Sequence, residues 1–276
     1  MRPIDPTQPL SVTFLGTGTS TGVPMIGCTC AVCTSSNPRN KRMRVSLVVG
    51  AANPTEGKTQ NVLVDTTPEM RIQLLRENLD RVEAILMTHS HADHIFGMDD
   101  VRQINFRHNM VMPIFGSKAT LDHIAHVFDY VFKVTQAGGG KPQLELKPLE
   151  ALQAALMPNG VQITPLPVFH GRLPIYSYKF GSSLAYLTDV SDIPDETMPY
   201  LYGLDTLILG AVRYEPHPTH FNLAQALEVI ATVKPKRAFL THLSHHFDHD
   251  TVNRELPPHV RLAYDGLTFT VPGSTD

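Results

Sequence analysis

Six consecutive residues, at positions 89–94, read His-Ser-His-Ala-Asp-His and offer four side chains that can bind a divalent metal. Neutral imidazoles and carboxylates are the usual protein ligands of zinc and similar ions. The segment follows a short apolar run at residues 84–87, which is typical of a buried strand. Six residues cannot complete two coordination spheres, so the remaining ligands must come from elsewhere in the chain. The candidate ligands in this segment are His89, His91, Asp93 and His94.

Three further candidate ligands each follow a later apolar run: His170, Asp189 and His242. The ends of strands carry the loops on which binding and catalytic groups are concentrated, so side chains distant in sequence can converge there. Any one of these residues alone would be better explained as a surface histidine or a helix-capping aspartate. The complete set favours a metal site.

A second cluster consists of three cysteines that lie within six residues of one another: Cys28, Cys30 and Cys33. An odd number of closely spaced thiols favours metal thiolates over disulfides. A tetrahedral zinc needs a fourth ligand, and we expect His245 to supply it in a closed structural zinc site. Such a site would fix the loop after the first strand to the last ligand loop. The alternative, three free cysteines acting as small apolar side chains, is disfavoured because their neighbours form no apolar stripe.

The elements that must position these residues alternate between strands and helices in both halves of the chain. The pattern predicts helices over residues 69–78, 99–107, 118–132 and 223–233. It predicts strands over residues 11–15, 45–50, 61–64, 84–87, 113–115, 161–169, 175–180, 184–187, 206–209, 237–240 and 267–271. No linker rich in Pro, Gly or Ser separates the halves. We therefore expect one domain, residues 1–276, with two sheets between layers of helices.

Composition limits the kinds of partner. The chain has 276 residues, a net charge of −3 and 18% charged residues, which is ordinary for a globular enzyme and does not favour nucleic-acid binding. A local basic strip at residues 39–44 leaves that possibility open. No apolar run approaches the ~20 residues needed to cross a bilayer. The polar, proline-rich start of the chain does not resemble a signal peptide, so we expect a cytoplasmic location.

Together these motifs resemble the metallo-β-lactamase superfamily, whose signature is His-x-His-x-Asp-His. The resemblance covers nearly the whole chain, in the order residues 16–18, Asp65, residues 89–94, His170, Asp189 and His242. It implies an α/β fold, a four-layer αββα sandwich with two mixed β-sheets between helices. It also implies two divalent catalytic ions, Zn or Mn. His89, His91 and His170 would hold one metal, Asp93, His94 and His242 the second, and Asp189 would bridge both.

The cysteine loop indicates which branch of this superfamily the chain resembles. A Cys-x-Cys-x-x-Cys loop after the glycine-rich turn, with a His three residues after the final ligand, is similar to the phosphoribosyl cyclic phosphate phosphodiesterase branch of this superfamily. This branch implies hydrolysis of a small cyclic or nucleotide-like phosphodiester by a metal-bridging hydroxide. An aspartate in place of cysteine at the bridging position points away from β-lactam cleavage. The catalytic candidates are then Asp93, Asp189 and His220.

Two histidines remain without a metal role, His217 and His220, just before the helix predicted at 223–233. A histidine titrates in the range useful for protonating a leaving oxygen. By resemblance to related phosphodiesterases we favour His220 as this acid, while His217 stays open. Three arginines could bind phosphate bidentately, although surface ion pairing is an equal alternative for each. They are Arg44, Arg102 and Arg213.

Two other functions remain as alternatives. A tRNA 3′-processing endoribonuclease is disfavoured because the chain lacks an evident long arm rich in Lys, Arg and Gly. A non-hydrolytic binding protein similar to the pyrroloquinoline quinone biosynthesis B protein shares the cysteine loop, but its relatives tend to lose ligands that are all present here. By analogy with the superfamily, a homodimer is a further expectation.

Overall fold

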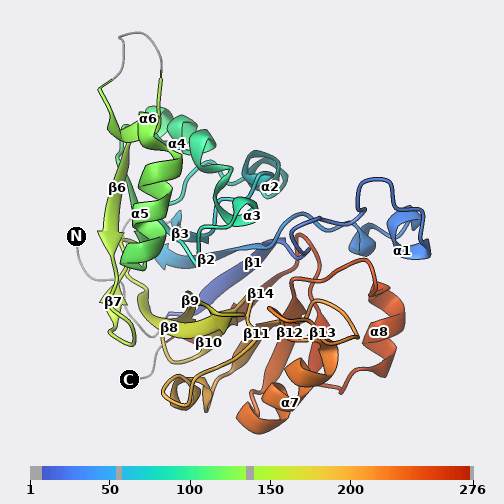
Figure 1. Ribbon diagram of the computed structural model, residues 1–276. Helices are drawn as coiled ribbons and strands as arrows, with labels where there is room; N and C mark the ends of the chain where they lie inside the picture. The colour runs from blue at the N-terminus through green and yellow to red at the C-terminus, as the bar shows by residue number, and fades with distance from the viewer. Residues whose placement is uncertain (1–7, 54–57, 135–139, 274–276) are drawn as a thin grey trace.

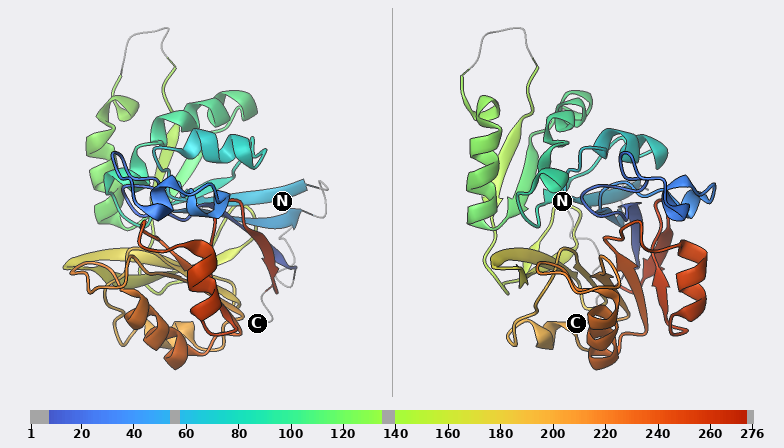
Figure 2. Two further views of the ribbon diagram at one scale, coloured as in Figure 1. Left: turned by 90° about the vertical axis from the view of Figure 1, so that its right-hand side faces the viewer. Right: turned by 45° about the vertical axis from the view of Figure 1, so that its right-hand side comes forward.

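The structure is a computed structural model that describes residues 8–53, 58–134 and 140–273. Residues 1–7, on which the expected cytoplasmic location partly rests, lie outside this range. Two seven-stranded sheets form the centre of the fold. They pack face to face between a layer of helices above and a layer below, as the left view of Figure 2 shows. The four-layer αββα sandwich expected from the sequence is therefore confirmed.

The first sheet has the strand order β14-β1-β2-β3-β4-β5-β6. Its first four strands are antiparallel neighbours, and β3 to β6 run parallel. The sheet is thus mixed, as expected. Its strands are β1 Leu10–Gly16, β2 Ser46–Asn53, β3 Lys58–Val64, β4 Ala84–Leu86, β5 Met112–Gly116, β6 Leu144–Pro148 and β14 Thr268–Val271.

The second sheet has the order β13-β12-β11-β10-β9-β8-β7. Here β10 to β13 are parallel, while β7 to β10 are antiparallel neighbours. The two sheets therefore repeat one plan, a parallel half joined to an antiparallel half. The strands are β7 Ala155–Leu156, β8 Gln162–His170, β9 Leu173–Phe180, β10 Leu184–Leu187, β11 Thr206–Gly210, β12 Arg237–Thr241 and β13 Val260–Leu262.

Helices cover the outer faces of both sheets. Figure 1 shows α2 to α6 over the first sheet and α7 and α8 over the second. The α-helices are α1 Ala31–Thr34, α2 Met70–Arg76, α3 Ala92–Ile95, α4 Val101–His108, α5 Lys118–Val127, α6 Asp129–Phe132, α7 Leu223–Val233 and α8 His249–Glu255. Short 3-10 turns lie at η1 Pro38–Asn40, η2 Met98–Asp100 and η3 Met198–Leu201.

The core between the sheets is built from large apolar side chains that alternate along the strands. Phe14 of β1 and Phe180, Tyr178 and Tyr186 of the second sheet are fully buried there. Separate apolar clusters lie under the helices on each side. Because both faces of the central strands are covered, β4 and β10 are apolar at almost every position, which explains the unbroken apolar runs in the sequence.

Capping side chains mark the starts of α5, α7 and α8. Asn222 caps α7, because its side chain accepts from the backbone of Gln225 while the Gln225 side chain accepts from the backbone of Asn222. The single helix predicted over residues 118–132 is wrong. The chain leaves helical geometry at Phe128 (φ −104°, ψ 41°), whose ring is buried, so α5 and α6 are separate.

Several elements were not predicted. Strand β6 is half exposed and alternates Leu with Glu and Lys, β7 is two residues long, and β13 is three. Strands this short carry little periodicity. Helix α8 begins after the cap Asp248, a signal the sequence analysis did not use. The single domain over residues 1–276 stays a prediction. Within the described residues, no helix has the length and apolar character needed to cross a membrane.

Candidate metal centre

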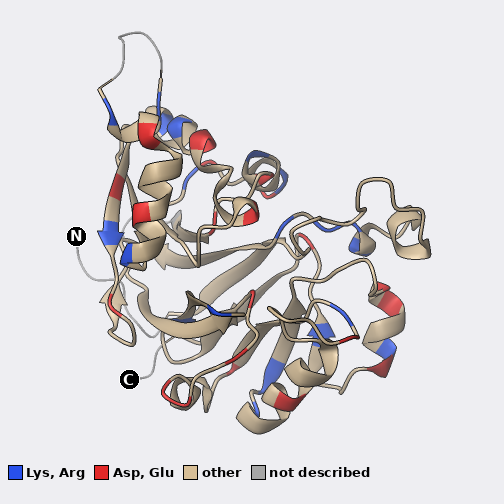
Figure 3. Ribbon diagram, viewed as in Figure 1, with Lys and Arg blue, Asp and Glu red and all other residues tan. Residues whose placement is uncertain are grey.

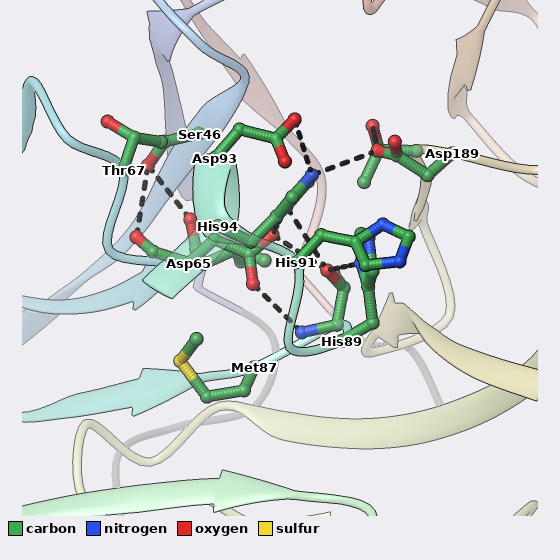
Figure 4. Close-up of polar contacts among 12 residues, drawn as sticks. Ser46, Asp65, Thr67, Met87, His89, His91, Asp93, His94 and Asp189 are labelled. Carbon is green, nitrogen blue, oxygen red and sulfur yellow. Dashed lines mark hydrogen bonds and ion pairs between the residues drawn. The ribbon is translucent and has the colours of Figure 1, made fainter. Parts of the chain in front are cut away.

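The seven expected ligands lie at strand ends drawn from both sheets. Residues 89–94 follow β4 of the first sheet. His170 closes β8, Asp189 lies two residues after β10, and His242 follows β12, all in the second sheet. Figure 4 shows the Asp189 side chain facing the residues of the 89–94 loop. The structure therefore brings the whole set into one place between the sheets, as the sequence predicted.

Backbone geometry aims the side chains of two of these ligands and of Asp65, which lies beside them. Asp65, Asp189 and His242 have positive φ angles of 62°, 55° and 57°. Residues other than glycine rarely adopt this left-handed conformation, and such strain costs about 1–3 kcal/mol and concentrates at functional sites. Each of the three directly follows or lies just beyond a buried strand. The turn at each strand end therefore directs the side chain into the site.

The first group of ligands contains only histidines. Nitrogens of His89, His91 and His170 all lie within 4.8 Å of one another. His89 Nε2 is 3.0 Å from His91 Nδ1. His170 donates its Nδ1–H to the backbone oxygen of Thr219 at 2.7 Å, which leaves Nε2 free to face the other two rings. These contacts suit three neutral imidazoles that share one cation.

The second group adds carboxylates. Ligand atoms of Asp93, His94, Asp189 and His242 also lie within 4.8 Å of one another. His94 Nε2 is 3.4 Å from a carboxylate oxygen of Asp93 and 3.4 Å from one of Asp189. His242 Nε2 is 3.0 Å from the other oxygen of Asp189. Asp189 also lies within 4.8 Å of His170, so its carboxylate reaches both groups.

A helical turn separates the two groups of histidines. The chain is extended at His91 and then turns into α3, with the N–H of His94 donating to the backbone oxygen of His91. This turn places Asp93 and His94 toward the second group, while His89 and His91 belong to the first.

Asp65 holds the His94 ring in place. Its fully buried carboxylate accepts from His94 Nδ1–H at 2.8 Å, from the backbone N–H of Thr88 at 2.9 Å and from the Thr88 hydroxyl at 2.8 Å. Held through Nδ1 in this way, His94 turns its Nε2 toward Asp93 and Asp189 (Figure 4). Sequence reasoning missed Thr88, whose position next to His89 was the available signal.

Buried atoms without partners test whether a cation fits. His94 Nε2 and both ring nitrogens of His242 are buried and have no hydrogen-bond partner among the described residues. A buried polar atom left unpaired costs about 1–3 kcal/mol, so native folds seldom keep several together. All but His242 Nδ1 face the Asp189 carboxylate. A divalent ion would satisfy them, so the residues present fit a metal centre.

The charge states of the free side chains also suit metal ligands. Burial lowers the pKa of His89 well below its usual value and lowers that of His91. Burial alone would raise the pKa of Asp189, but His242 and His94 outweigh it and hold that pKa well below the ordinary range. At neutral pH, His89 and His91 are therefore neutral and Asp189 is ionised, the forms that bind a cation. His94 is the exception, because Asp189 and Asp65 outweigh its burial and raise its pKa well above the usual value, so His94 has to release a proton when a cation binds.

His220 lies against the ligands. Its ring stacks on His242, with centroids 4.6 Å apart, and its Nδ1 is 3.8 Å from an oxygen of Asp189. Burial and the neighbouring His242 lower the pKa of His220 to about 2. The ring of His217 lies beside that of His220, with centroids 4.8 Å apart, and its Nδ1 accepts a hydrogen bond from the backbone N–H of Thr219. His220 could also serve as a metal ligand with His170 and Asp189, which the sequence analysis did not consider.

The cysteine loop forms a second, separate cluster. The sulfur atoms of Cys28, Cys30 and Cys33 lie 3.2, 3.4 and 3.7 Å from His245 Nδ1. The N–H of Cys33 donates to the Cys30 sulfur and, as the largest influence, lowers the pKa of Cys30 to about 6. All four ligand atoms lie within 4.8 Å of one another. The structure thus brings together the four residues that the sequence selected.

The basic strip at residues 39–44 is largely used inside the fold. Arg42 is buried and donates to the backbone oxygens of Ser244 and Phe247 at 2.9 and 2.7 Å. Lys41 donates to the backbone oxygen of Cys33. In the view of Figure 3, basic and acidic residues are interspersed on the helices and do not gather on one face.

The three arginines proposed to bind phosphate already have partners. Arg44 pairs with Glu69, and Arg102 lies 3.4 Å from Asp99. Arg213 donates to two backbone oxygens of its own loop. A substrate would have to compete with these contacts.

We expect replacement of Asp65 by Ala to lower the affinity for a divalent metal by about 10- to 100-fold, because the His94 ring loses its anchor. Asp65→Asn, which keeps one acceptor oxygen, should lose less. Competition with a chromophoric chelator measures this affinity, and the exposed Asp122→Ala serves as control. Unchanged affinity in a folded Asp65→Ala protein would contradict the role of Asp65.

The chain is similar to a known family and to two characterised proteins. Residues 60–243, more than half of the chain, match the family described as the beta-lactamase superfamily domain. An octanoyltransferase from Porphyromonas gingivalis is 37% identical over 259 residues, which cover 92% of this chain and 50% of that protein. The chain therefore spans about half the length of this relative. Coenzyme PQQ synthesis protein B from Methylobacterium radiotolerans is 26% identical over 230 residues, 75% of this chain and 74% of that protein.

Solved structures resemble the whole chain. A diphosphatase from the PhnP family has 42% sequence identity and a TM-score of 0.87, covering 96% of this chain and 98% of its own. Human tRNase Z, short form, has 20% identity and a TM-score of 0.65, covering 95% and 99%. Zinc-bound PqqB from Methylobacterium extorquens has 16% identity and a TM-score of 0.72, covering 94% and 99%. The latter two likenesses show the fold alone.

Proposed function

The chain belongs to the β-lactamase superfamily, and we propose that it is a binuclear metal-dependent phosphodiesterase acting on a small phosphodiester. The observation that carries this proposal is the carboxylate of Asp189, which lies within reach of His94, His242 and His170 and so can be shared by two cations. The 42% identical structure named a diphosphatase supports a phosphorus-centred reaction.

The bound ions would supply an activated water at neutral pH and would offset the negative charge that grows on the phosphoryl oxygens. The chain's own residues fix where this happens. Asp65 and Thr219 orient His94 and His170 through their Nδ1 atoms. Asp93, mostly buried at the edge of the second group, keeps a low pKa because its ion pair with His94, at 3.4 Å, outweighs the effect of burial. It therefore stays ionised as a ligand.

His220 is the proposed acid for the leaving oxygen. It lies beside Asp189 and stacks on His242, so its ring borders both ligand groups. As a free side chain it is neutral, because burial and His242 lower its pKa, so it would have to gain a proton before it could donate one to the leaving oxygen. His217, further from Asp189 and bonded to Thr219, is the less favoured candidate.

The same site does not favour the alternative functions, acyl transfer and RNA processing. The name octanoyltransferase belongs to a relative of which this chain covers 50%, so it does not define the reaction of the part that matches. RNA processing would need a free basic surface, whereas Arg42 and Lys41 are held inside the fold. We therefore propose a small-molecule substrate. The cytoplasm is the proposed location because clustered thiols persist where the environment is reducing. The homodimer stays a prediction.

We expect metal-loaded protein to hydrolyse bis(4-nitrophenyl) phosphate, and Asp189→Ala to lower kcat/KM at least 1000-fold, or about 4 kcal/mol in transition-state stabilisation. The loss follows because both ligand groups lose their shared carboxylate. Release of nitrophenolate is followed by absorbance, with the exposed Asp195→Ala as control. Full turnover after complete removal of metal by a chelator would refute the proposal.

Replacement of His220 by Ala should lower turnover about 100-fold or more for a diester with an alkoxide leaving group, within the usual range for general acids. The effect on a nitrophenyl diester should be small, because nitrophenolate leaves without a proton. The matched variant is His217→Ala, for which both substrates should change little. Equal losses for the two leaving groups in His220→Ala would show that His220 is not the acid.

We propose that Cys28, Cys30, Cys33 and His245 hold a structural zinc. Replacing Cys30 by Ser should remove one zinc per chain and lower the melting temperature, because the loop loses a ligand that ties it to His245. Metal content by mass spectrometry and thermal unfolding provide the readouts, with the exposed neighbour Thr29→Ser as control. If Cys30→Ser keeps its zinc and its melting temperature, this cluster is not a structural site.

A further inference from the structure

The hairpin that carries His170 ends in a tight turn of two residues. His170 of β8 pairs with Leu173 of β9, so Gly171 and Arg172 alone form the turn. Gly171 has φ +63°, and a Cβ there would come within 2.9 Å of the Thr219 side chain. A glycine at the first position is the signature of a tight hairpin turn. Arg172 therefore follows a metal-ligand candidate by two residues, at the tip of the hairpin.

Hydrogen bonds hold this turn firmly. The Gly171 N–H donates to the Ser191 hydroxyl at 2.8 Å, and that hydroxyl donates to the backbone oxygen of Phe169 at 3.0 Å. On the other side, His170 donates to the backbone oxygen of Thr219. The turn is thus tied both to the loop after Asp189 and to the loop that carries His220. The base of the Arg172 side chain has a fixed position relative to the ligands.

The Arg172 guanidinium differs from its counterparts around the site. It is exposed, and no hydrogen bond or ion pair joins it to any other described residue. Arg44, Arg102 and Arg213, by contrast, are all engaged by carboxylates or backbone oxygens. Two residues span at most about 7 Å of chain, so Arg172 lies near enough to His170 for its long side chain to reach an anion held beside His89, His91 and His170.

The net charge of the metal-loaded site indicates how many phosphoryl groups it can neutralise. Two divalent ions bring four positive charges, which Asp93, Asp189 and the attacking hydroxide reduce to about one. That balance suits one singly charged phosphoryl group. A second phosphoryl group next to it would need another cation, and a guanidinium binds phosphate oxygens in a bidentate manner.

We propose that Arg172 binds a second phosphoryl group, and that the substrate is an organic diphosphate with an ester on each phosphate. This inference rests on the proposed phosphodiesterase function and names its substrate class. One phosphoryl group lies at the metal ligands while its neighbour lies against Arg172. The diphosphatase among the compared structures is consistent with this assignment.

The reaction balances with water alone. The water oxygen forms one bond to the phosphorus at the metal ligands, and the bond from that phosphorus to the bridging oxygen breaks. The electron pair of the broken bond stays on the bridging oxygen, which departs on the second phosphate. The products are two phosphate monoesters, and the protons of the water pass to them and to solvent. Arg172 stabilises the charge that develops on the departing phosphate.

The test compares a substrate with two phosphates and a substrate with one. In metal-loaded protein, Arg172→Ala should lower kcat/KM for P1,P2-di(adenosine-5′) diphosphate at least 30-fold and for bis(4-nitrophenyl) phosphate less than threefold. Arg172→Lys should fall between Ala and the unaltered protein on the diphosphate. The matched control is Arg71→Ala, an exposed arginine on α2.

An equilibrium measurement gives an independent readout. By titration calorimetry, metal-loaded protein should bind adenosine diphosphate at least tenfold more tightly than adenosine monophosphate, and Arg172→Ala should abolish that preference. Equal losses on the two substrates, or an unchanged preference for the diphosphate, would overturn the assignment of Arg172. Failure to hydrolyse either substrate would instead refute the proposed phosphodiesterase function itself.

Discussion

The carboxylate of Asp189 contacts histidines that follow strands of both sheets, and the rest of the site depends on these contacts. One of its oxygens lies 3.4 Å from His94, in the helical turn that follows β4 of the first sheet, and the other lies 3.0 Å from His242, directly after β12 of the second. Burying an ionised carboxylate is costly unless it is paired, and here the partners are histidines with further unpaired nitrogens. A cation on each side resolves that cost. The fold therefore brings these groups together at a position where metal binding and packing support each other.

Hydrogen bonds between the loops around the site hold the His242 loop in place beside Asp189. Gly18, just after β1, pairs with Leu243, the residue after His242. A Cβ on Gly18 would lie 2.9 Å from the backbone oxygen of Arg42, so the close approach of these strands depends on glycine. Arg42 in turn binds the backbone at Ser244 and Phe247. The cysteine loop, these contacts and His245 thus hold the last ligand loop from outside the site.

The sequence predicted more of the site than of the fold boundaries, for a physical reason. A ligand must be a particular residue type, so His89, Asp189 and His242 are visible in the sequence wherever the chain carries them. Positioning is done by common groups such as the Thr88 hydroxyl and the Thr219 backbone oxygen, whose role depends on tertiary contact. Edge strand β6 and the break at Phe128 were missed because their local pattern is weak and packing decides them.

The measurement that tests the account most directly is the location of bound metal by anomalous diffraction at the zinc absorption edge. We expect two peaks on either side of the Asp189 carboxylate, about 3.5–4 Å apart. One peak should lie near His89, His91 and His170, and the other near Asp93, His94 and His242. A fully metal-loaded crystal with no peak within bonding distance of Asp189 would contradict the shared-carboxylate centre.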